Sequence, residues 1–419
     1  MSECLCVHYR QELVGLLEQT AARTMKFVYD DGWLRSAARF PISLSLPLDG
    51  TFTDSESQYF FANLLPEGNV REQICKSLRI SADNDFELLK AIGGDCAGAL
   101  TITGTRNGEL PEKPPRYEQV TEEQLARWSP GTPNVFAAVT GQGDIRLSLA
   151  GAQDKLPVYI EGTQIMIPLG SAPSTHILKF ASPHYSHLPE NETFMTILAK
   201  EVGLPVVDVR IRKTAKSSIT IIARYDRQWE AGQWMRLHQE DFCQALGIDA
   251  SRKYEKEGGP SYKHCADLIR RHVNFPLLDL QKLLRWSLYN LLTGNADAHG
   301  KNLSLLYGSS GSPSLAPFYD LVCTRNYRNL SRELAMSAGG VWNPDVVSAK
   351  QLSALADDLG IRPNLVIEQA KELADRIMLS LPLVIEVFRE QYGDSPVLQR
   401  LPAIIRKLVR RLSSQLKSR

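Results

Sequence analysis

The sequence contains no long apolar run. Its apolar stretches stay well short of the about 18 residues that a membrane-spanning helix needs. The N-terminal stretch MSECLCVHYRQELVG carries Glu, His, Arg and Gln where a signal peptide needs an apolar segment. These two absences argue against a membrane partner, and we expect the protein to stay in the cytoplasm.

Paired cysteines are also absent. The seven cysteines make an odd number and show no metal-ligand spacing, so we expect reduced thiols. Cys4, Cys6 and His8 alternate near the N-terminus, and this pattern is open to two interpretations. The three side chains could bind a metal, but one side of an edge strand produces the same alternation and is the interpretation that we favour.

The chain carries almost no net charge. A formal charge of +1 argues against a globally basic nucleic-acid binder. A local exception is the C-terminal run RLPAIIRKLVRRLSSQLKSR, in which basic and apolar residues recur at helical spacing (Arg406, Lys407, Arg410 and Arg411, with Ile405, Leu408 and Leu412). This spacing predicts an amphipathic helix with a solvated basic face, and a contact to the DNA backbone or to an acidic protein is the alternative.

The order of the predicted elements indicates several structural units. With 419 residues, the chain is too long for one compact core of ordinary size. Short strands fill residues 143–225, interrupted by one helix at ENETFMTILAKEVG, and helical periodicity dominates after residue 236. We expect an N-terminal subdomain (1–105), a proline-rich linker with a short helix (106–134), a β-rich lobe (135–235) and a helical lobe (236–419).

Several helix boundaries are marked in the sequence. Thr121 with Gln124 has the spacing of a capping box, and so has Ser348 with Gln351. Gly294 stands where a C-cap belongs, directly after a leucine-rich stretch. The leucines of that stretch fall on one face and predict a buried helix (Leu280, Leu283, Leu284, Leu288, Leu291 and Leu292).

The loop TGNADAHGKN at residues 293–302 concentrates polar side chains after that helix. Asp297 and Asn302 are five residues apart, as are the base and the metal-binding Asn of a kinase catalytic loop. Asp320 in PFYDLV follows the strand-like NLSLLYG, so a strand-loop-strand hairpin would bring all three side chains to one end. Lys179 on the strand THILKF precedes a helix that carries Glu192, as the Lys and Glu of kinases do. Taken alone, the loop also fits an ordinary Asn/Asp-rich turn.

Several longer motifs, taken in order, resemble those of the HipA family, the serine/threonine kinase toxins of bacterial type II toxin-antitoxin modules. They are LSLAGAQDKLPV, THILKF, NETFMTILAKEVGLPV, IIARYDR, RLHQEDFCQALG, KYEKEGGP, GNADAHGKNLSLLY and LAPFYDLV. Upstream, PISLSLPL, FFANLLPEG and IGGDCAGAL resemble the family's N-terminal subdomain. The resemblance implies an α+β, bilobal protein-kinase-like (HipA-like) fold, in which a β-rich N-lobe with an added N-terminal subdomain precedes a mostly helical C-lobe.

The resemblance also implies roles for individual residues. Asp297 would be the catalytic base, Asn302 and Asp320 the Mg²⁺ ligands, and Lys179 the cation on the phosphates of ATP. The other implied ATP contacts form three groups (Ala150, Gly151, Ala152, Gln153, Asp154 and Lys155 in a phosphate-covering loop; Ala223, Arg224 and Tyr225 in the segment that links the lobes; His299, Lys301 and Tyr319 beside the base and the metal ligands).

The motifs depart from those of ordinary protein kinases in three places. No Walker A or Gly-x-Gly-x-x-Gly sequence occurs, so in the phosphate-covering loop only Gly151 permits a close backbone approach. His299 stands two residues after the Asp, where a Lys is usual, and Lys301 follows; which of the two reaches the transferred phosphate is left open. Asn-Ala-Asp and Asp-Leu-Val replace the triplets His-Arg-Asp and Asp-Phe-Gly.

Ser148 matches the serine that HipA phosphorylates on itself. A phosphate there would repel a loop meant for the phosphates of ATP, so the resemblance implies autoinhibition. The alternation of Leu147, Ser148 and Leu149 fits an ordinary strand equally well. Glu240 and Asp241 also match a family motif and would orient the catalytic loop or the protein substrate, or cap the following helix.

The function that we favour is an ATP- and Mg²⁺-dependent serine/threonine protein kinase acting as a HipA-type bacterial toxin. Its protein substrate would be related to translation, such as an aminoacyl-tRNA synthetase, as for members of that family. A HipB-like helix-turn-helix antitoxin would be a separate partner, and DNA would be reached through that complex. The alternatives are a catalytically weak kinase fold acting mainly as an antitoxin-bound corepressor, and a small-molecule kinase with the same chemistry.

Overall fold

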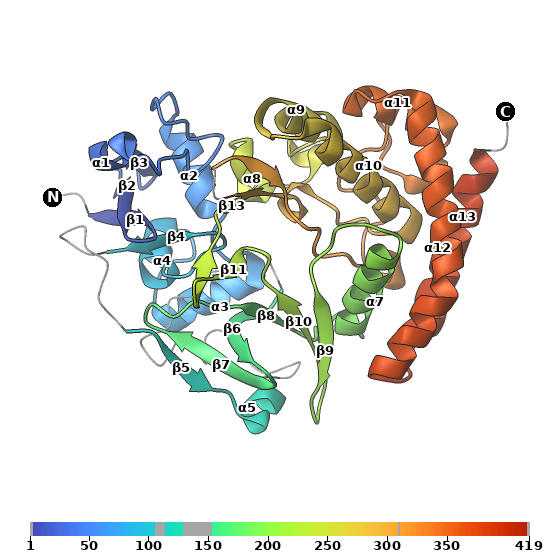
Figure 1. The fold of residues 1–419 in the computed structure, drawn as a ribbon, viewed down its shortest axis with the longest axis horizontal. Helices are drawn as coiled ribbons and strands as arrows, with labels where there is room; N and C mark the ends of the chain where they lie inside the picture. The colour runs from blue at the N-terminus through green and yellow to red at the C-terminus, as the bar shows by residue number, and fades with distance from the viewer. Residues whose placement is uncertain (1–2, 105–113, 129–152, 309–310, 417–419) are drawn as a thin grey trace. The chain divides into compact units, whose positions relative to one another are not determined.

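The computed structural model describes residues 3–104, 114–128, 153–308 and 311–416. The chain divides into two compact units (Figure 1). Unit 1 comprises Met1–Pro183, Lys213–Ser251 and Leu306–Gly311, and unit 2 comprises His184–Arg212, Arg252–Leu305 and Ser312–Arg419. The chain therefore passes between the units several times and does not complete one before it begins the other.

Unit 1 opens with an antiparallel sheet in the order β3-β2-β1-β4. The strands are β1 (Cys4–Tyr9), β2 (Glu12–Gln19), β3 (Met25–Tyr29) and β4 (Leu100–Thr103). The prediction that Cys4, Cys6 and His8 lie on an edge strand is wrong, because β1 pairs with β2 on one side and with β4 on the other. The β4 strand returns from far along the chain, which no local pattern near the N-terminus specifies. None of the seven cysteines, all of which are described, forms a disulfide.

The helices between β3 and β4 complete this part of unit 1. They are α1 (Asp31–Arg35), α2 (Asp54–Ala62), α3 (Gly68–Leu78) and α4 (Asp85–Ile92). A capping box of Thr53 and Glu56 begins α2, which buries Phe60 and Phe61. The chain leaves the helical conformation before Pro66, as the proline predicts.

The second sheet of unit 1 carries the predicted phosphate-contacting strands. Within unit 1 its strands run in the order β5-β7-β6-β8-β10. The elements of this region are β5 (Arg116–Gln119), α5 (Glu122–Arg127), β6 (Lys155–Glu161), β7 (Gln164–Leu169), β8 (His176–Phe180), β10 (Ser218–Ala223), β11 (Arg227–Glu230), β12 (Gln233–Arg236), β13 (Gln239–Asp241) and α8 (Phe242–Ala245). The predicted capping box of Thr121 and Gln124 is confirmed at the start of α5.

Unit 2 is mainly helical. Its elements are α7 (Leu188–Glu201), β9 (Val209–Lys213, of which Lys213 belongs to unit 1), η2 (Glu255–Glu257), α9 (Tyr262–His272), α10 (Pro276–Thr293), η3 (Gly300–Asn302), β14 (Ser304–Tyr307, whose last two residues belong to unit 1), β15 (Pro313–Leu315), η4 (Thr324–Asn326), η5 (Pro344–Val346), α11 (Ala349–Leu359), α12 (Pro363–Tyr392) and α13 (Val397–Gln415). The predicted leucine-rich helix is α10, in which the six leucines of the predicted face are buried, and Gly294 ends it in the left-handed conformation, with φ of 78°.

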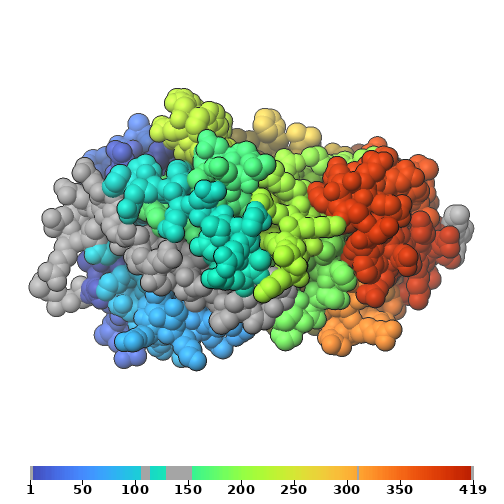
Figure 2. Space-filling view, turned by 90° about the horizontal axis from the view of Figure 1, so that it is seen from below, coloured from blue at the N-terminus to red at the C-terminus, as the bar shows by residue number. Residues whose placement is uncertain are grey.

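The C-terminal helices of unit 2 agree with the sequence pattern. The α12 and α13 helices lie side by side (Figure 1), and together they form one continuous surface on the face drawn in Figure 2. Ile405, Leu408 and Leu412 of α13 are buried, whereas Lys407 and Arg410 are exposed, so the predicted amphipathic helix is confirmed. No described helix is both long enough and apolar enough to span a membrane.

Candidate functional site

The predicted catalytic loop connects α10 to β14 and is fixed by its own side chains. Asn295 Oδ1 accepts a hydrogen bond from the backbone N–H of Asp297 at 3.1 Å. Asn302 Nδ2 donates to the carbonyl oxygen of Asp297 at 2.8 Å. The peptide groups on both sides of the Asp297 Cα are therefore held, and the amide oxygen of Asn302 points away from that carbonyl.

The carboxyl group of Asp297 combines exposure with one firm contact. Its side chain is 54% exposed, so a substrate hydroxyl can approach it. Tyr254 Oη donates a hydrogen bond to Asp297 Oδ1 at 2.6 Å. The buried His299 lies beside them, with Nε2 3.9 Å from Oδ1 and its ring edge-to-face with that of Tyr254. Tyr254 therefore fixes one carboxyl oxygen, and the carboxylate remains accessible as a proton acceptor.

Asp320 lies in a segment that is tied to this loop. The hydroxyl of Tyr319 donates to the carbonyl oxygen of Lys301 at 2.8 Å and is hydrogen-bonded to Ser304 Oγ at 2.6 Å. Asp320 itself adopts a φ of 54°, a left-handed conformation that is strained for a residue other than glycine. The predicted hairpin of β14 and β15 is confirmed by the hydrogen bond from the Ala316 N–H to the Ser304 carbonyl oxygen.

Thr324 links the same segment to the beginning of the loop. Its hydroxyl donates to the carbonyl oxygen of Gly294 at 3.0 Å and accepts the N–H of Ala296 at 2.8 Å. The segment that carries Asp320 is thus hydrogen-bonded to both ends of the loop that carries Asp297. The sequence-predicted side chains Asp297, Asn302 and Asp320 consequently belong to one local arrangement in unit 2.

The donor set of this arrangement suits a hard cation that is also held by phosphate oxygens. Asp320 offers a carboxylate and Asn302 an amide oxygen, and Mg²⁺ is commonly bound by one or two such ligands together with phosphates. In the part of the chain that the structure describes, no three His, Cys, Asp or Glu side chains form a metal cluster. The residues present therefore fit a cation that arrives with a polyphosphate better than a metal bound by protein ligands alone.

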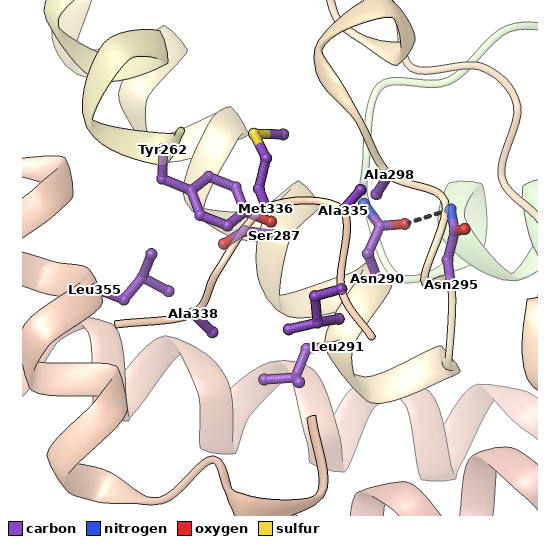
Figure 3. A pocket seen from close by; sticks show the side chains of 11 residues that line it. Tyr262, Ser287, Asn290, Leu291, Asn295, Ala298, Ala335, Met336, Ala338 and Leu355 are labelled. Carbon is purple, nitrogen blue, oxygen red and sulfur yellow. Dashed lines mark hydrogen bonds between the residues drawn. The ribbon is translucent and has the colours of Figure 1, made fainter. Parts of the chain in front are cut away.

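A small cavity lies behind the catalytic loop (Figure 3). Its volume is about 10 Å³, which is room for about one water molecule and far too little for a nucleotide. Asn290 on α10 accepts a hydrogen bond from Asn295 Nδ2 at 3.0 Å, and its own Nδ2 has no partner among the described residues. Met336 and Ala338 line the cavity from the segment after η4. The cavity thus fits a bound water that would support Asn290, and through it Asn295.

The predicted phosphate-contacting lysines lie in unit 1. Lys155 and Lys179 are directly opposite each other on the antiparallel strands β6 and β8, so their side chains emerge on one face of the sheet. Lys179 is 5% exposed. Two ammonium groups on one face suit an anion such as a polyphosphate. The predicted partner Glu192 is buried in α7, in unit 2.

Two further residues of the predicted phosphate-covering loop are described. Gln153 Nε2 donates to the carbonyl oxygen of Phe180 at 3.1 Å, which anchors the start of β6 to the end of β8. Burial raises the pKa of Asp154. Ala150, Gly151, Ala152 and Ser148 lie outside the described residues.

The predicted lobe-linking segment begins at Ala223, the last residue of β10. The N–H of Arg224 donates to the carbonyl oxygen of Thr175 at 3.0 Å, and Tyr225, which is half-buried, has its hydroxyl hydrogen-bonded to Gln239. The side chain of Arg224 is buried in an ion network that we define by five residues (Asp95, Arg224, Asp226, Arg227 and Arg236).

The ion network balances its charges by direct contacts. Both nitrogens of the Arg224 fork bind Asp226, at 2.9 and 2.7 Å, and Arg227 binds Asp95 at 2.7 Å. Burial alone would raise the pKa of Asp226, but the charges of Arg224 and Arg227 outweigh burial and hold that pKa well below its usual range. Burial lowers the pKa of Arg227 to about 10, so it stays charged at neutral pH.

Glu240 and Asp241 have separate structural roles. Asp241 caps α8 through a capping box with Gln244, which is one of the roles expected for it. Glu240 is fully buried in unit 1 and accepts hydrogen bonds from the hydroxyls of Ser43 and Tyr307 and from the N–H of Leu44. Burial raises the pKa of Glu240 to about 7, although these hydrogen bonds oppose the shift.

Sequence reasoning gave no role to several residues that shape the site. Tyr254 belongs to the motif KYEKEGGP, but nothing in its spacing from Asp297 indicates a contact 43 residues away. The contacts of Thr324 and Asn290 with the catalytic loop could not be predicted from the sequence either, because they depend on the tertiary fold. Only the loop's own density of polar residues gave a local signal.

Two family models match the chain. The model of the HipA N-terminal domain matches residues 5–103, and the model of the HipA-like C-terminal domain matches residues 147–381. The chain is 37% identical to the Sinorhizobium fredii protein Y4mE over 398 residues, which is 93% of this chain and 94% of that protein.

Two further comparisons concern HipA of Shewanella oneidensis. The serine/threonine-protein kinase toxin HipA of that organism is 36% identical over 394 residues, covering 90% of this chain and 88% of the toxin. The structure of HipA from Shewanella oneidensis MR-1, solved in complex with HipB and its operator DNA, matches with a TM-score of 0.81 and 32% identity. That match covers 98% of this chain and 96% of the other.

Proposed function

Because the chain belongs to the HipA family of serine/threonine-protein kinases, we propose that it transfers the terminal phosphoryl group of ATP to a protein hydroxyl. The observation that carries this proposal is the geometry around Asp297. A half-exposed carboxylate with one oxygen fixed by Tyr254 is suited to accept the proton of a substrate hydroxyl.

Asn302 and Asp320 are proposed as the ligands of Mg²⁺. Asn302 would use its amide oxygen, since its nitrogen is engaged with Asp297. Bound there with ATP, Mg²⁺ would neutralise charge on the phosphate oxygens. Tyr319 and Thr324 would hold the Asp320 segment against the loop, so that base and ligands keep a fixed relation.

The remaining ATP-contacting residues are proposed from the resemblance to the HipA family. In unit 1, Lys179 and the residues Gln153 to Lys155 would contact the phosphates, and Ala223 to Tyr225 would contact the adenine. In unit 2, His299, Lys301 and Tyr319 would stand beside the nucleotide. Ala150 to Ala152 would belong to the same phosphate-covering loop, and phosphorylation of Ser148 would inhibit the kinase by repelling that loop.

The substrate and partners are proposed on the same basis. A translation-related protein, such as an aminoacyl-tRNA synthetase, would be the phosphorylated target, with arrest of growth as the consequence. The HipA structure solved with HipB and operator DNA supports a HipB-like antitoxin as the partner, through which the chain would reach DNA. A weak kinase that acts mainly as a corepressor is the outcome to test against.

The test is transfer of label from γ-labelled ATP in the presence of Mg²⁺. We expect incorporation by the wild-type protein and a loss of about 10²- to 10⁴-fold in Asp297→Asn, because the amide cannot accept the proton. Asp267→Asn is the matched control, since Asp267 is paired on the surface of α9 with Arg270, and it should keep full activity. Wild-type incorporation no higher than that of Asp297→Asn would favour the corepressor.

The target and the modified serine need separate measurements. Ser148→Ala should abolish labelling of the kinase itself while transfer to an added substrate continues. Phosphoproteomics after induced expression should show one dominant protein target. An absence of such a target together with full ATP turnover would indicate a small-molecule kinase.

A further inference from the structure

The fully buried amide of Asn191, on α7, lies against the backbone that follows Asp320. Its Oδ1 accepts the N–H of Cys323 at 2.9 Å, and its Nδ2 donates to the carbonyl oxygen of Cys323 at 3.1 Å and to Tyr327 Oη at 3.2 Å. Asn191 and Cys323 are both 0% exposed. One side chain, 132 residues distant in sequence, therefore satisfies both backbone groups of Cys323 where water cannot reach them.

The residues before Cys323 need such support. Asp320 has a φ of 54°, a conformation that persists in a non-glycine residue only when its surroundings fix it. On its N-terminal side, the N–H of Phe318 donates to the Pro205 carbonyl oxygen at 2.8 Å. On its C-terminal side, the side chain of Asn191 holds the backbone at Cys323. The strained metal-ligand candidate is thus anchored on both sides.

The residue after Cys323 carries the constraint to the catalytic loop. Thr324 is hydrogen-bonded to Gly294 and Ala296, and Ala296 immediately precedes Asp297. A shift of the Cys323 backbone would therefore move Asp320 on one side and the support of the Asp297 loop on the other. Asn191 acts at the point where these two connections meet.

We propose that Asn191 is a positioning residue that fixes the Cys323 backbone and thereby sets Asp320 and the Asp297 loop in register. This inference rests on the proposed kinase function, in which Asp320 is a metal ligand. In this role, α7 positions the Asp320 segment through the Asn191 amide. The Phe of an Asp-Phe-Gly triplet is not needed, and this chain has Asp-Leu-Val at that place. The competing explanation is that Asn191 only satisfies buried backbone groups.

Substitution of Asn191 separates these explanations when the readouts include one that does not require activity. Asn191→Ser is too short to reach Cys323. In the nucleotide-free protein, we expect amide hydrogen exchange of the peptide that contains Cys323 to accelerate about tenfold. With ADP present, we expect the affinity for Mn²⁺, measured by electron paramagnetic resonance, to fall about tenfold, and the phosphorylation rate to fall with it.

Two further variants keep the test decisive. Asn191→Leu has a similar volume and should show the same loss of Mn²⁺ affinity if Asn191→Ser does not fold. Thr196→Val is the matched control, because Thr196 is buried on the same helix and its hydroxyl donates to the carbonyl oxygen of Glu192, within α7. The control should leave both readouts within about twofold of the wild type.

The possible outcomes bear on different claims. Faster exchange at Cys323 with unchanged Mn²⁺ affinity would overturn the positioning role and leave Asn191 purely structural. An equal effect of Thr196→Val would overturn it as well, because helix α7 would then act as a whole. Failure of the wild-type protein to bind Mn²⁺ with ADP, or an unaltered affinity in Asp320→Asn, would instead overturn the proposed metal site itself.

Discussion

Two clusters of charged side chains in this molecule use opposite means to hold a carboxylate. In the ion network of unit 1, Asp226 is 2% exposed and both of its oxygens bind arginine nitrogens. In the catalytic loop of unit 2, Asp297 is 54% exposed and accepts a hydrogen bond from the neutral hydroxyl of Tyr254. Two cationic partners stabilise a carboxylate as an anion and occupy its oxygens, whereas a neutral donor on one oxygen of an exposed carboxylate leaves the group accessible to a substrate hydroxyl.

The difference shows how the same residue type serves structure in one region and chemistry in another. The arginines in the network remove the cost of burying a carboxylate but occupy the atoms that a substrate would need. Tyr254 fixes a rotamer and adds no charge. A cluster of charged residues alone therefore does not identify a catalytic site. The carboxylate oxygen must also be accessible to the substrate.

Breaking the network should give the largest change in stability. Asp226→Asn places an N–H group among the Arg224, Arg227 and Gly98 donors and leaves the two buried arginines with Asp95 as their remaining anion. We expect the free energy of unfolding to fall by about 3–5 kcal/mol, measured by urea denaturation at pH 7. In the same assay, Asp297→Asn should change it by less than about 0.5 kcal/mol.

The matched control for that prediction is a carboxylate paired on the surface. Asp267 binds Arg270 at 2.9 Å on α9, with both side chains about one third exposed. Asp267→Asn should cost at most about 1 kcal/mol, because solvent screens an exposed pair. Equal losses for Asp226→Asn and Asp267→Asn would contradict the view that burial makes the network essential.

Much of this contrast could be anticipated from the sequence, but not all of it. The spacing of Asp297 and Asn302 and the strand-loop-strand pattern before Asp320 are local, and together they predicted a common location for these side chains. Glycines such as Gly294 marked where helices end. The long-range pairings gave no such signal. The family resemblance implied that Arg224 and Tyr225 belong to an adenine-contacting segment. The side chain of Arg224, however, lies in the ion network with Asp95, which is 129 residues away in the chain.

The same limit explains the error at the N-terminus. Alternation of Cys4, Cys6 and His8 specifies a strand but not its neighbours, and β4 is supplied about 90 residues later. The contacts of Tyr254 with Asp297 and of Asn191 with Cys323 were not predicted for the same reason, because each joins residues that are far apart in the sequence. Periodicity records which face of an element is buried, but not what covers it.

A third carboxylate sharpens the comparison, because Glu240 is buried like Asp226 but has only neutral donors as hydrogen-bond partners. Its pKa is raised to about 7, against 4.5 for an unburied Glu. Between these two pH values the folded protein therefore binds a proton at Glu240 that the unfolded protein has lost. This contribution to stability is full below pH 4.5 and is lost as the pH rises through about 7. Glu240→Gln keeps an acceptor for Leu44 and Tyr307 and removes the titration.

We therefore expect the difference in free energy of unfolding between Glu240→Gln and the wild type to change by about 2 kcal/mol in favour of Glu240→Gln as the pH rises from 5 to 8. Urea denaturation at both pH values measures the change. Glu123→Gln is the control, since Glu123 is an exposed partner of Arg127 and should show no such dependence. A constant difference between wild type and Glu240→Gln across this range would show that Glu240 does not titrate there.

The smallest expected effect tests the neutral donor in the catalytic loop. Tyr254→Phe removes the hydroxyl from Asp297 Oδ1 and keeps the ring that packs edge-to-face with His299. We expect kcat to fall about tenfold, equivalent to about 1.4 kcal/mol, with the KM for ATP unchanged, because the base loses its preferred rotamer while ATP contacts persist. Lys256→Gln, two residues further along in an exposed pair with Glu333, should leave both constants as in the wild type. If Tyr254→Phe kept the wild-type kcat, or raised KM alone, the carboxylate would have to be held by something other than this hydroxyl, and the contrast with the arginine-bound Asp226 would lose its basis.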